Sequence, residues 1–206
     1  KEYTKDFDQN VGGLSWADNN TIYFISDYHA TDEIYKLTLN DGKIDKLTEG
    51  VHNYTSVIPV NDYLIATKVS MSKPAEIYKV DPTTGKDTEL SFVNKGILDQ
   101  LTMGKVESRW IKTTDNKQML TWVIYPPHFD PNKKYPAILY CEGGPQSTVS
   151  QFWSYRWNFQ MMAANGYIIV ARTVAAYRDL DKNGMNKSVE TIPDKISRTT
   201  SLLSTS

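Results

Sequence analysis

"DEIYKLTLNDGKIDKLTE", from Asp32 to Glu49, and "AEIYKVDPTTGKDTELSF", from Ala75 to Phe92, are two copies of one pattern. The tetrapeptide EIYK begins at Glu33 and at Glu76, and the dipeptide GK begins at Gly42 and at Gly85, so both recur at an offset of 43 residues. A fixed period of this length is typical of proteins built from repeated supersecondary units. The sequence therefore predicts two copies of one structural unit in the first half of the chain.

Alternating apolar residues predict strands within each copy. The segments with this alternation are 21–26, 33–39, 63–70 and 76–80. The turns "NDG" (40–42) and "PTTG" (82–85) separate them, because glycine beside Asn, Asp or Thr suits a hairpin turn. One antiparallel unit of four strands every 40–50 residues is the period of a β-propeller blade. Two blades cannot close a ring, so we expect a piece of a longer chain; a self-contained small β-sandwich is the alternative.

The second half changes to an α/β pattern. "VESRWIKTT" (106–114) and "QMLTWVIYPP" (118–127) predict a hairpin around Asp115–Lys117. After a loop rich in proline and charge, "AILYCEGGP" (137–145) predicts a strand covered on both faces. "FWSYRWNFQMMAANG" (152–166) is apolar nearly all round and predicts a buried helix, and "YIIVA" (167–171) predicts a strand parallel to the previous one.

The glycines at the end of the strand at 137–145 mark the predicted site. Open α/β sheets place ligands at the carboxyl ends of their strands, and Gly143 and Gly144 let backbone N–H groups approach a bound group. A plain strand-to-loop turn is the alternative. Cys141, the single cysteine, is interpreted as a small apolar residue at the end of a buried strand.

Composition excludes several classes of protein. The 206 residues are 40% hydrophobic and 12% aromatic, enough for a real core, and the formal net charge of −1 gives no field to attract nucleic acid. No apolar run reaches the roughly 18 residues of a membrane span. A single cysteine allows neither an intrachain disulfide nor a cysteine cluster for zinc or iron–sulfur.

"PPHFDPNKKYPAILYCEGGPQS" (126–147), "FWSYRWNFQMMAANGYIIVA" (152–171) and the preceding repeats resemble the prolyl oligopeptidase family of serine peptidases. The segment is most similar to bacterial dipeptidyl peptidases and acylaminoacyl-peptidase-like members. The resemblance covers roughly residues 1–171. It implies a β-propeller joined to an α/β-hydrolase domain, a Ser-Asp-His triad that needs no metal and no organic cofactor, and short peptide substrates.

The resemblance also implies that Glu142, Gly143 and Gly144 form the oxyanion loop. Relatives often have tyrosine or histidine at the position of Glu142, and an ionised carboxylate cannot donate a hydrogen bond. We therefore expect backbone N–H groups to stabilise the oxyanion. For the Glu142 side chain the alternative is a structural bond to the loop backbone.

The catalytic triad is expected to lie outside this sequence. No G-x-S-x-G motif occurs, and the resemblance places all three residues beyond Ala171. His29, His52 and His128 lie in repeat or loop contexts and are interpreted as surface or structural residues, because none follows a candidate nucleophile. We therefore predict no catalytic residue and no turnover in this chain.

The tail after Ala171 does not resemble the family. Inserting one nucleotide ahead of Arg172, with permitted codons, changes the encoded residues to the family-like Pro-Asn-Arg-Arg-Gly-Leu. We hypothesise that residues 172–206 are an out-of-frame translation, testable by sequencing the gene. Their polar composition predicts poor packing.

Three segments follow from these patterns. Residues 1–103 are the last blades of a β-propeller, 104–171 are the N-terminal part of an α/β-hydrolase domain, and 172–206 are the tail. The alternatives to a serine exopeptidase are a non-catalytic propeller module that binds a peptide or protein, and an unstable product without function. The resemblance favours a periplasmic over a cytoplasmic location, and the oligomeric state stays open.

Overall fold

The computed structural model describes residues 2–114, 116, 118–141 and 148–172. The chain forms two compact units. Unit 1 comprises residues 1–103 together with Ser150–Asn158, and unit 2 comprises Gly104–Val149 together with the chain from Phe159 onward. The predicted oxyanion loop and most of the tail lie outside the described residues.

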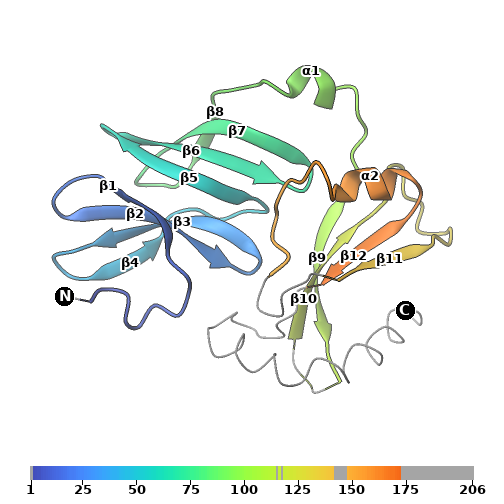
Figure 1. Ribbon diagram of the computed structural model, residues 1–206, viewed down its shortest axis with the longest axis horizontal. Coiled ribbons are helices and arrows are strands. Elements are labelled where there is room, and N and C mark those ends of the chain that lie inside the picture. Colours follow the sequence, from blue (N-terminus) through green and yellow to red (C-terminus); the bar gives the residue numbers. More distant parts are fainter. Residues whose placement is uncertain (1, 115, 117, 142–147, 173–206) are drawn as a thin grey trace. The chain divides into compact units, whose positions relative to one another are not determined.

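Unit 1 contains two antiparallel meanders of four strands each (Figure 1). The strands of the first meander are β1 (Gly12–Trp16), β2 (Thr21–Tyr28), β3 (Thr31–Thr38) and β4 (Lys43–Lys46). Those of the second are β5 (Asn53–Val60), β6 (Tyr63–Ser70), β7 (Lys73–Val80) and β8 (Asp87–Glu89). The strands predicted in each repeat are confirmed. The meanders join at one parallel bridge, between Asp32 and Asn53.

The predicted glycine turns recur at the same offset as the sequence repeat. Gly42 N–H donates to the Thr38 carbonyl at 2.8 Å, and Gly85 N–H donates to the Asp81 carbonyl at 2.9 Å. Both glycines have positive φ, 76° and 70°. Gly85 has a second constraint, because a Cβ there would lie 1.9 Å from the Leu47 carbonyl oxygen of the first copy. Its turn therefore packs against the preceding repeat, which only glycine allows.

A buried glutamate explains why EIYK recurs. Glu33 is 0% exposed and accepts hydrogen bonds from the Thr48 hydroxyl at 2.6 Å and the Gly50 N–H at 3.1 Å. The Thr48 hydroxyl in turn accepts the Ile34 N–H at 2.9 Å. Glu33 thus connects β3, a central strand of the first meander, to the chain that follows this meander.

The second copy repeats this arrangement with serine in place of threonine. Glu76, 2% exposed, accepts from the Ser91 hydroxyl and from the Asn94 backbone and side chain at 2.9 and 3.0 Å. The Ser91 hydroxyl accepts the Ile77 N–H at 2.8 Å. We call Glu33 with Thr48, and Glu76 with Ser91, the glutamate locks.

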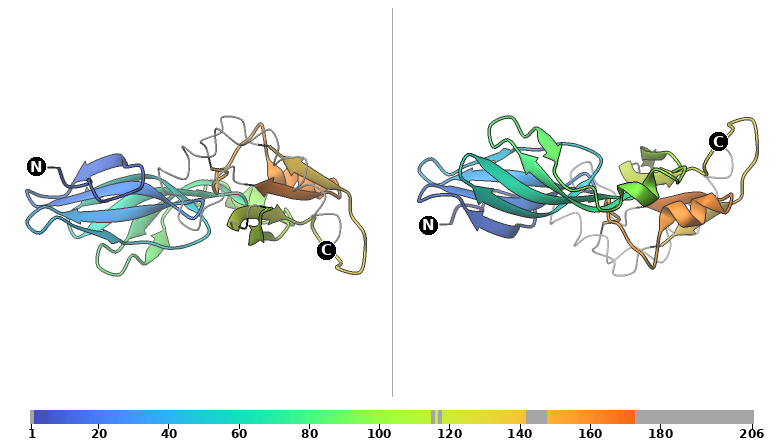
Figure 2. Two further views of the ribbon diagram at one scale, coloured as in Figure 1. Left: turned by 90° about the horizontal axis from the view of Figure 1, so that it is seen from below. Right: turned by 90° about the horizontal axis from the view of Figure 1, so that it is seen from above.

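Apolar side chains fill the space between the two meanders. Tyr23 and Ile34 of the first meander pack with a set from the second, namely Tyr54, Val57, Leu64, Ala66 and Val80. The opposite face of the first meander is covered by the N-terminal segment, where the Phe7 ring lies 5.6 Å from Phe24 and 5.4 Å from Tyr35. Both views in Figure 2 show the twisted strands of this unit.

A short helix, α1 (Lys95–Leu98), follows the second meander and buries none of its side chains. No pattern in the sequence predicted it. It is a single turn, closed by a bond from the Leu98 N–H to the Asn94 carbonyl at 2.9 Å. The backbone N–H of Asn94 also donates to Glu76 at 2.9 Å, so the start of α1 is fixed by Glu76.

Unit 2 is a mixed sheet with strand order β11-β12-β10-β9. Its elements are β9 (Val106–Lys112), β10 (Gln118–Ile124), β11 (Ala137–Tyr140), α2 (Phe159–Ala164) and β12 (Ile168–Arg172). The hairpin of β9 and β10 is confirmed, although Asp115 and Lys117 of its turn lie outside the described residues. The parallel pairing of β11 with β12 is confirmed too. All of β10 except Gln118 is buried.

Two expectations for unit 2 are wrong. β11 is exposed or half-buried rather than covered on both faces, because it lies at the edge of the described sheet and pairs there with β12 alone. The predicted helix at 152–166 is reduced to α2, which buries Phe159, Gln160 and Ala163 but leaves Met161 67% exposed. This helix is therefore amphipathic, and residues 152–158 belong to unit 1 instead.

Candidate functional site

The candidate site is the pair of carboxyl ends of β11 and β12. The strands are parallel and in register, with Tyr140 opposite Ala171, so their ends meet at one edge of the sheet. Glu142, Gly143 and Gly144 follow β11 and lie outside the described residues. The structure thus describes the frame of the predicted oxyanion loop, up to residue 141 before it and from residue 148 after it.

Cys141 is exposed, which corrects its interpretation as a buried residue. The reason is the edge position of β11, whose side chains are only half covered. The ring of Tyr140 packs edge-on against Phe159, the first residue of α2, at 4.9 Å. This contact fixes the start of α2 beside the end of β11.

Gln160 and Gly104 also hold α2 in place. Gly104 N–H donates to the Gln160 side-chain oxygen at 2.7 Å, and the Gln160 amide donates back to the Gly104 carbonyl at 3.0 Å. Gln160 is 5% exposed, so this pair of bonds satisfies a buried amide. A Cβ at residue 104 would lie 1.8 Å from the Tyr125 carbonyl oxygen, so glycine is required there.

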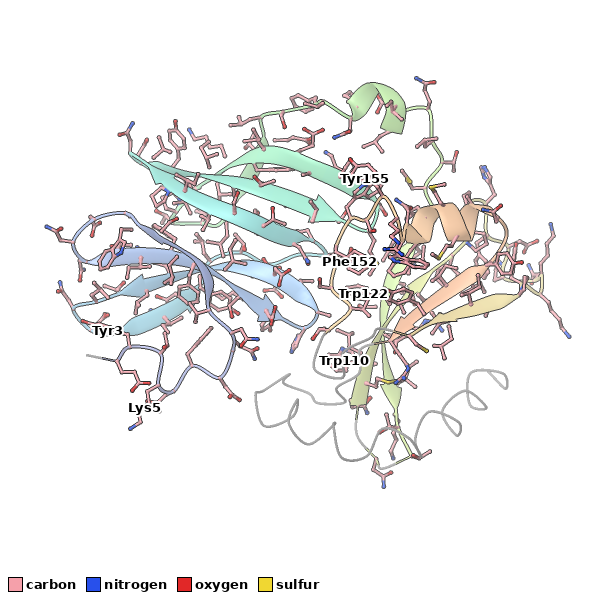
Figure 3. The ribbon with its side chains drawn as sticks, in the orientation of Figure 1. Tyr3, Lys5, Trp110, Trp122, Phe152 and Tyr155 are labelled. Carbon is pink, nitrogen blue, oxygen red and sulfur yellow. The ribbon has the colours of Figure 1, made fainter. Side chains whose placement is uncertain are left out.

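Val149, which follows the predicted oxyanion loop, is held within unit 2 by a buried hydrogen bond. The indole N–H of Trp122 on β10 donates to the Val149 carbonyl at 2.9 Å, and both residues are almost fully buried. Figure 3 labels Trp122 on its strand. A buried, directional bond of this kind fixes the path of the chain that returns from the glycine loop.

Asn53 fixes the next residues, within unit 1. Its Nδ2 donates to the Ser150 hydroxyl at 2.8 Å, and its Oδ1 accepts the N–H of Gln151 at 3.1 Å and of Asp32 at 3.2 Å. Gln151 is 1% exposed and accepts the Met71 N–H at 3.2 Å. These bonds hold residues 150–151 in a non-helical path within unit 1, and this is the physical reason why the predicted helix does not begin at Phe152. No sequence pattern indicated this role for Asn53.

The aromatic side chains of Tyr155 and Trp157, which follow, are exposed and do not pack in a core. Tyr155 is 82% exposed and Trp157 is 49% exposed, so neither belongs to a buried core, unlike the buried helix expected over 152–166. The Ser154 hydroxyl accepts the N–H groups of Arg156 and Trp157, at 3.2 and 2.9 Å, and shapes a turn. The Arg156 guanidinium lies 5.4 Å from the Trp157 ring. Phe152 and Tyr155 are labelled in Figure 3.

The acidic pair Asp27 and Asp32 lies across β2 and β3, next to Asn53. The pKa of Asp32 is raised to about 8, first by burial and then by the hydrogen bond that its protonated carboxyl donates to Asp27 and by the charges of Asp27 and Glu33. A neighbouring like charge disfavours the ionised form of Asp32, which adds to the effect of burial. The stretch "SDYHATDE" (26–33) contained this pair, but its cross-strand register was needed to bring the two together.

The histidines lie in turns and bends of the chain. His29 has φ of 49° in the β2–β3 turn, and His128 has φ of 57° in its loop. His52 lies 3.5 Å from the Glu33 carboxylate, with a side chain 15% exposed. In the part of the chain that the structure describes, no group of three or more His, Cys, Asp or Glu side chains gathers as a metal site requires. No helix there is long and apolar enough to cross a membrane.

Comparison with known proteins decides the family. The chain is 49% identical over 166 residues to dipeptidyl-peptidase 5 of Porphyromonas gingivalis, a match that covers 80% of this chain and 24% of the relative. It is 46% identical over 150 residues to dipeptidyl-peptidase 5 of Porphyromonas endodontalis, covering 73% of this chain and 22% of the relative. No protein-family model matches. The chain belongs to the prolyl oligopeptidase family.

The fold agrees with this membership. The acylaminoacyl peptidase of Pyrococcus horikoshii superposes with a TM-score of 0.76 at 22% identity, over 98% of this chain and 32% of that one. This is a likeness of fold. The chain spans about a quarter of the length of the curated relatives that it matches.

Proposed function

We propose that this chain is part of a serine exopeptidase of the dipeptidyl-peptidase type, which hydrolyses short peptides through an acyl-enzyme. Residues 1–103 would be the last two blades of its propeller, and 104–171 would begin its α/β-hydrolase domain. The observation that carries the proposal is the 49% identity to dipeptidyl-peptidase 5, which extends across 80% of the chain. The glutamate locks, repeated at one period, support the assignment of blades.

In this proposal the chain supplies the scaffold of the oxyanion site. The loop of Glu142, Gly143 and Gly144 follows β11, at the sheet edge where the carboxyl ends of parallel strands place ligands. Backbone N–H groups of the loop would stabilise the negative charge that develops on the scissile carbonyl oxygen. Trp122 and Asn53 would act as positioning residues, because they fix Val149, Ser150 and Gln151 just after the loop.

The nucleophile would come from outside these residues, since the sequence contains no G-x-S-x-G motif. The purified chain should therefore show no labelling by a fluorescent fluorophosphonate and no hydrolysis of a fluorogenic dipeptide. Covalent labelling of this chain would contradict the proposal, because an activated serine is needed for it. Peptide binding without labelling is the result expected for the alternative, a non-catalytic binding module.

A chimera tests the positive half of the proposal. Residues 1–171 would replace the matching segment of the P. gingivalis relative, and dipeptide hydrolysis should persist. In the chimera, Glu142→Gln should leave kcat within about threefold, since the side chain has no oxyanion role. Gly143→Pro removes a loop N–H and should lower kcat by about 100-fold, the usual effect of losing one oxyanion donor. A folded but inactive chimera, or a large loss in Glu142→Gln, would refute this assignment.

A further inference from the structure

Unit 1 contains a cavity of about 200 Å³ that the peptidase chemistry does not use. It lies where the chain before β5 meets the hairpin of β6 and β7. The residues that line it are Val51, His52, Lys68, Val69, Ser70, Lys73 and Tyr78. None of these is an aspartate or a glutamate, whereas two are lysines.

Lys68 is held rigidly at the cavity wall. Its side chain is 16% exposed, it forms an ion pair with Asp87 of β8, and its ammonium lies 3.9 Å from the centre of the Tyr78 ring. Asp87 also accepts a hydrogen bond from the Tyr54 hydroxyl at 2.7 Å. Burial raises the pKa of Asp87, but the bonds from Lys68 and Tyr54 outweigh it and lower the pKa below its usual value. Asp87 is therefore ionised, and Lys68 keeps N–H donors beyond the one it gives to Asp87.

Lys73 is held in a similar way from the next strand. It pairs with Glu89 at 2.5 Å and donates to the Tyr78 hydroxyl at 3.3 Å. Asp87 and Glu89 are two residues apart on β8, so they orient both lysines from one side without lining the cavity. The two carboxylates thus orient the lysine side chains, and the remaining N–H donors of both ammonium groups are available at the cavity.

We propose that this cavity binds a small oxyanion, a phosphate or a carboxylate, between Lys68 and Lys73. An ammonium group has three donors and no acceptor. Two ammonium groups at one cavity wall therefore suit the lone pairs of an oxyanion. Ser70 also lines the cavity, and its hydroxyl, which accepts the Ser72 N–H at 3.2 Å, still has a hydrogen to donate. Because Asp87 and Glu89 offset the lysine charges, we expect modest affinity, with Kd of about 1 mM at low ionic strength. The proposal is independent of peptidase activity.

Titration of the full chain with inorganic phosphate, followed by calorimetry or by NMR shifts, tests this inference. Lys73→Gln should weaken phosphate binding at least about tenfold, equivalent to about 1.4 kcal/mol. The matched control is Lys79→Gln on the same strand, whose ammonium lies 4.4 Å from the Tyr63 ring and outside the cavity lining. Its Kd for phosphate should equal that of the unsubstituted chain.

Parallel titrations with acetate distinguish the two sources of the oxyanion. Saturable binding of either anion that is weakened by Lys73→Gln and not by Lys79→Gln supports the proposal. Far-UV circular dichroism checks that each variant is folded. If Lys73→Gln unfolds, Tyr78→Phe serves instead: it removes the hydroxyl that orients Lys73 but keeps the ring, and should weaken binding several-fold. No saturable response to phosphate or acetate in the folded chain, or equal binding by Lys73→Gln and Lys79→Gln, would overturn the inference.

Discussion

Thr48→Ala gives the sharpest test of the glutamate locks. The Thr48 hydroxyl donates to Glu33 at 2.6 Å and accepts the N–H of Ile34 at 2.9 Å, and Glu33 and Ile34 are both 0% exposed. The substitution removes a hydrogen bond to a charged group, which contributes about 1.5–3 kcal/mol, and leaves a buried N–H without its partner, which costs about 1–3 kcal/mol. Glu33 keeps its bond from the Gly50 N–H, which moderates the loss. We expect a net decrease of about 3 kcal/mol in the free energy of unfolding.

Urea unfolding, followed by circular dichroism, measures the effect. With a slope of about 2 kcal/mol per molar urea, the midpoint should fall by about 1.5 M. Hydrogen exchange gives a local readout, because the Ile34 amide should lose protection. Thr48→Ser keeps the hydroxyl and is the control, with an expected loss below about 1 kcal/mol.

The second lock supplies a graded comparison. Ser91→Ala removes the same bonds to Glu76 and Ile77, but Ile77 is 46% exposed, so water can replace the lost partner. We expect about half the effect of Thr48→Ala. If Thr48→Ala and Thr48→Ser were equally stable, or if Ile34 kept its protection in Thr48→Ala, the reasoning about buried hydroxyl bridges would be refuted.

Three further changes test other contacts. Burial raises the pKa of Glu76, but hydrogen bonds from Ser91 and Asn94 outweigh it and lower the pKa to about 2. The contribution of Glu76 to stability should therefore be full above pH 4.5 and be lost as pH falls to about 2. Glu76→Gln should abolish that pH dependence in acid titrations of stability. The pKa of Asp32 is raised to about 8, so its contribution to stability is full below pH 3.8 and is lost as pH rises through 8. Asp32→Asn should therefore raise the urea midpoint at pH 9. A lower midpoint would contradict the raised pKa. Gly85→Ala should cost about 3 kcal/mol or more in thermal unfolding because of its steric clash and positive φ, whereas Gly96→Ala in α1, with open space around it, should be neutral or slightly stabilising.

The family and the strands could be read from the sequence because they depend on local and repeated features. Period-two alternation at 63–70 and 76–80 predicted β6 and β7, and glycines 42 and 85 predicted turns that need positive φ. The parallel pairing of β11 with β12 followed from two apolar strands that flank a helical segment. These signals concern residues that are close in the chain, where sterics and burial act without distant partners.

The sequence also carries a signal for the locks. Leu47-Thr48 and Leu90-Ser91 recur at the same offset as EIYK, and a hydroxyl kept at one position in both copies indicates a shared partner. The cavity of Lys68 and Lys73 gave no comparable signal. Its residues come from β6, β7 and the chain before β5, and their separation in sequence hides their proximity.

Sequence alone determined the repeat, the strand pattern and the family, because each rests on the order of residue types along the chain. Tertiary structure decided which individual side chains are buried and which are exposed. It buried Glu33 and Glu76 beside Thr48 and Asn94, partners that lie 15 or more residues away. It also exposed Cys141 on an edge strand, and shortened the predicted helix because Asn53 and Met71 bind residues 150–151 instead. The physical reason is that a polar group's burial depends on whether a distant partner satisfies its hydrogen bonds, and only the folded chain brings those partners together.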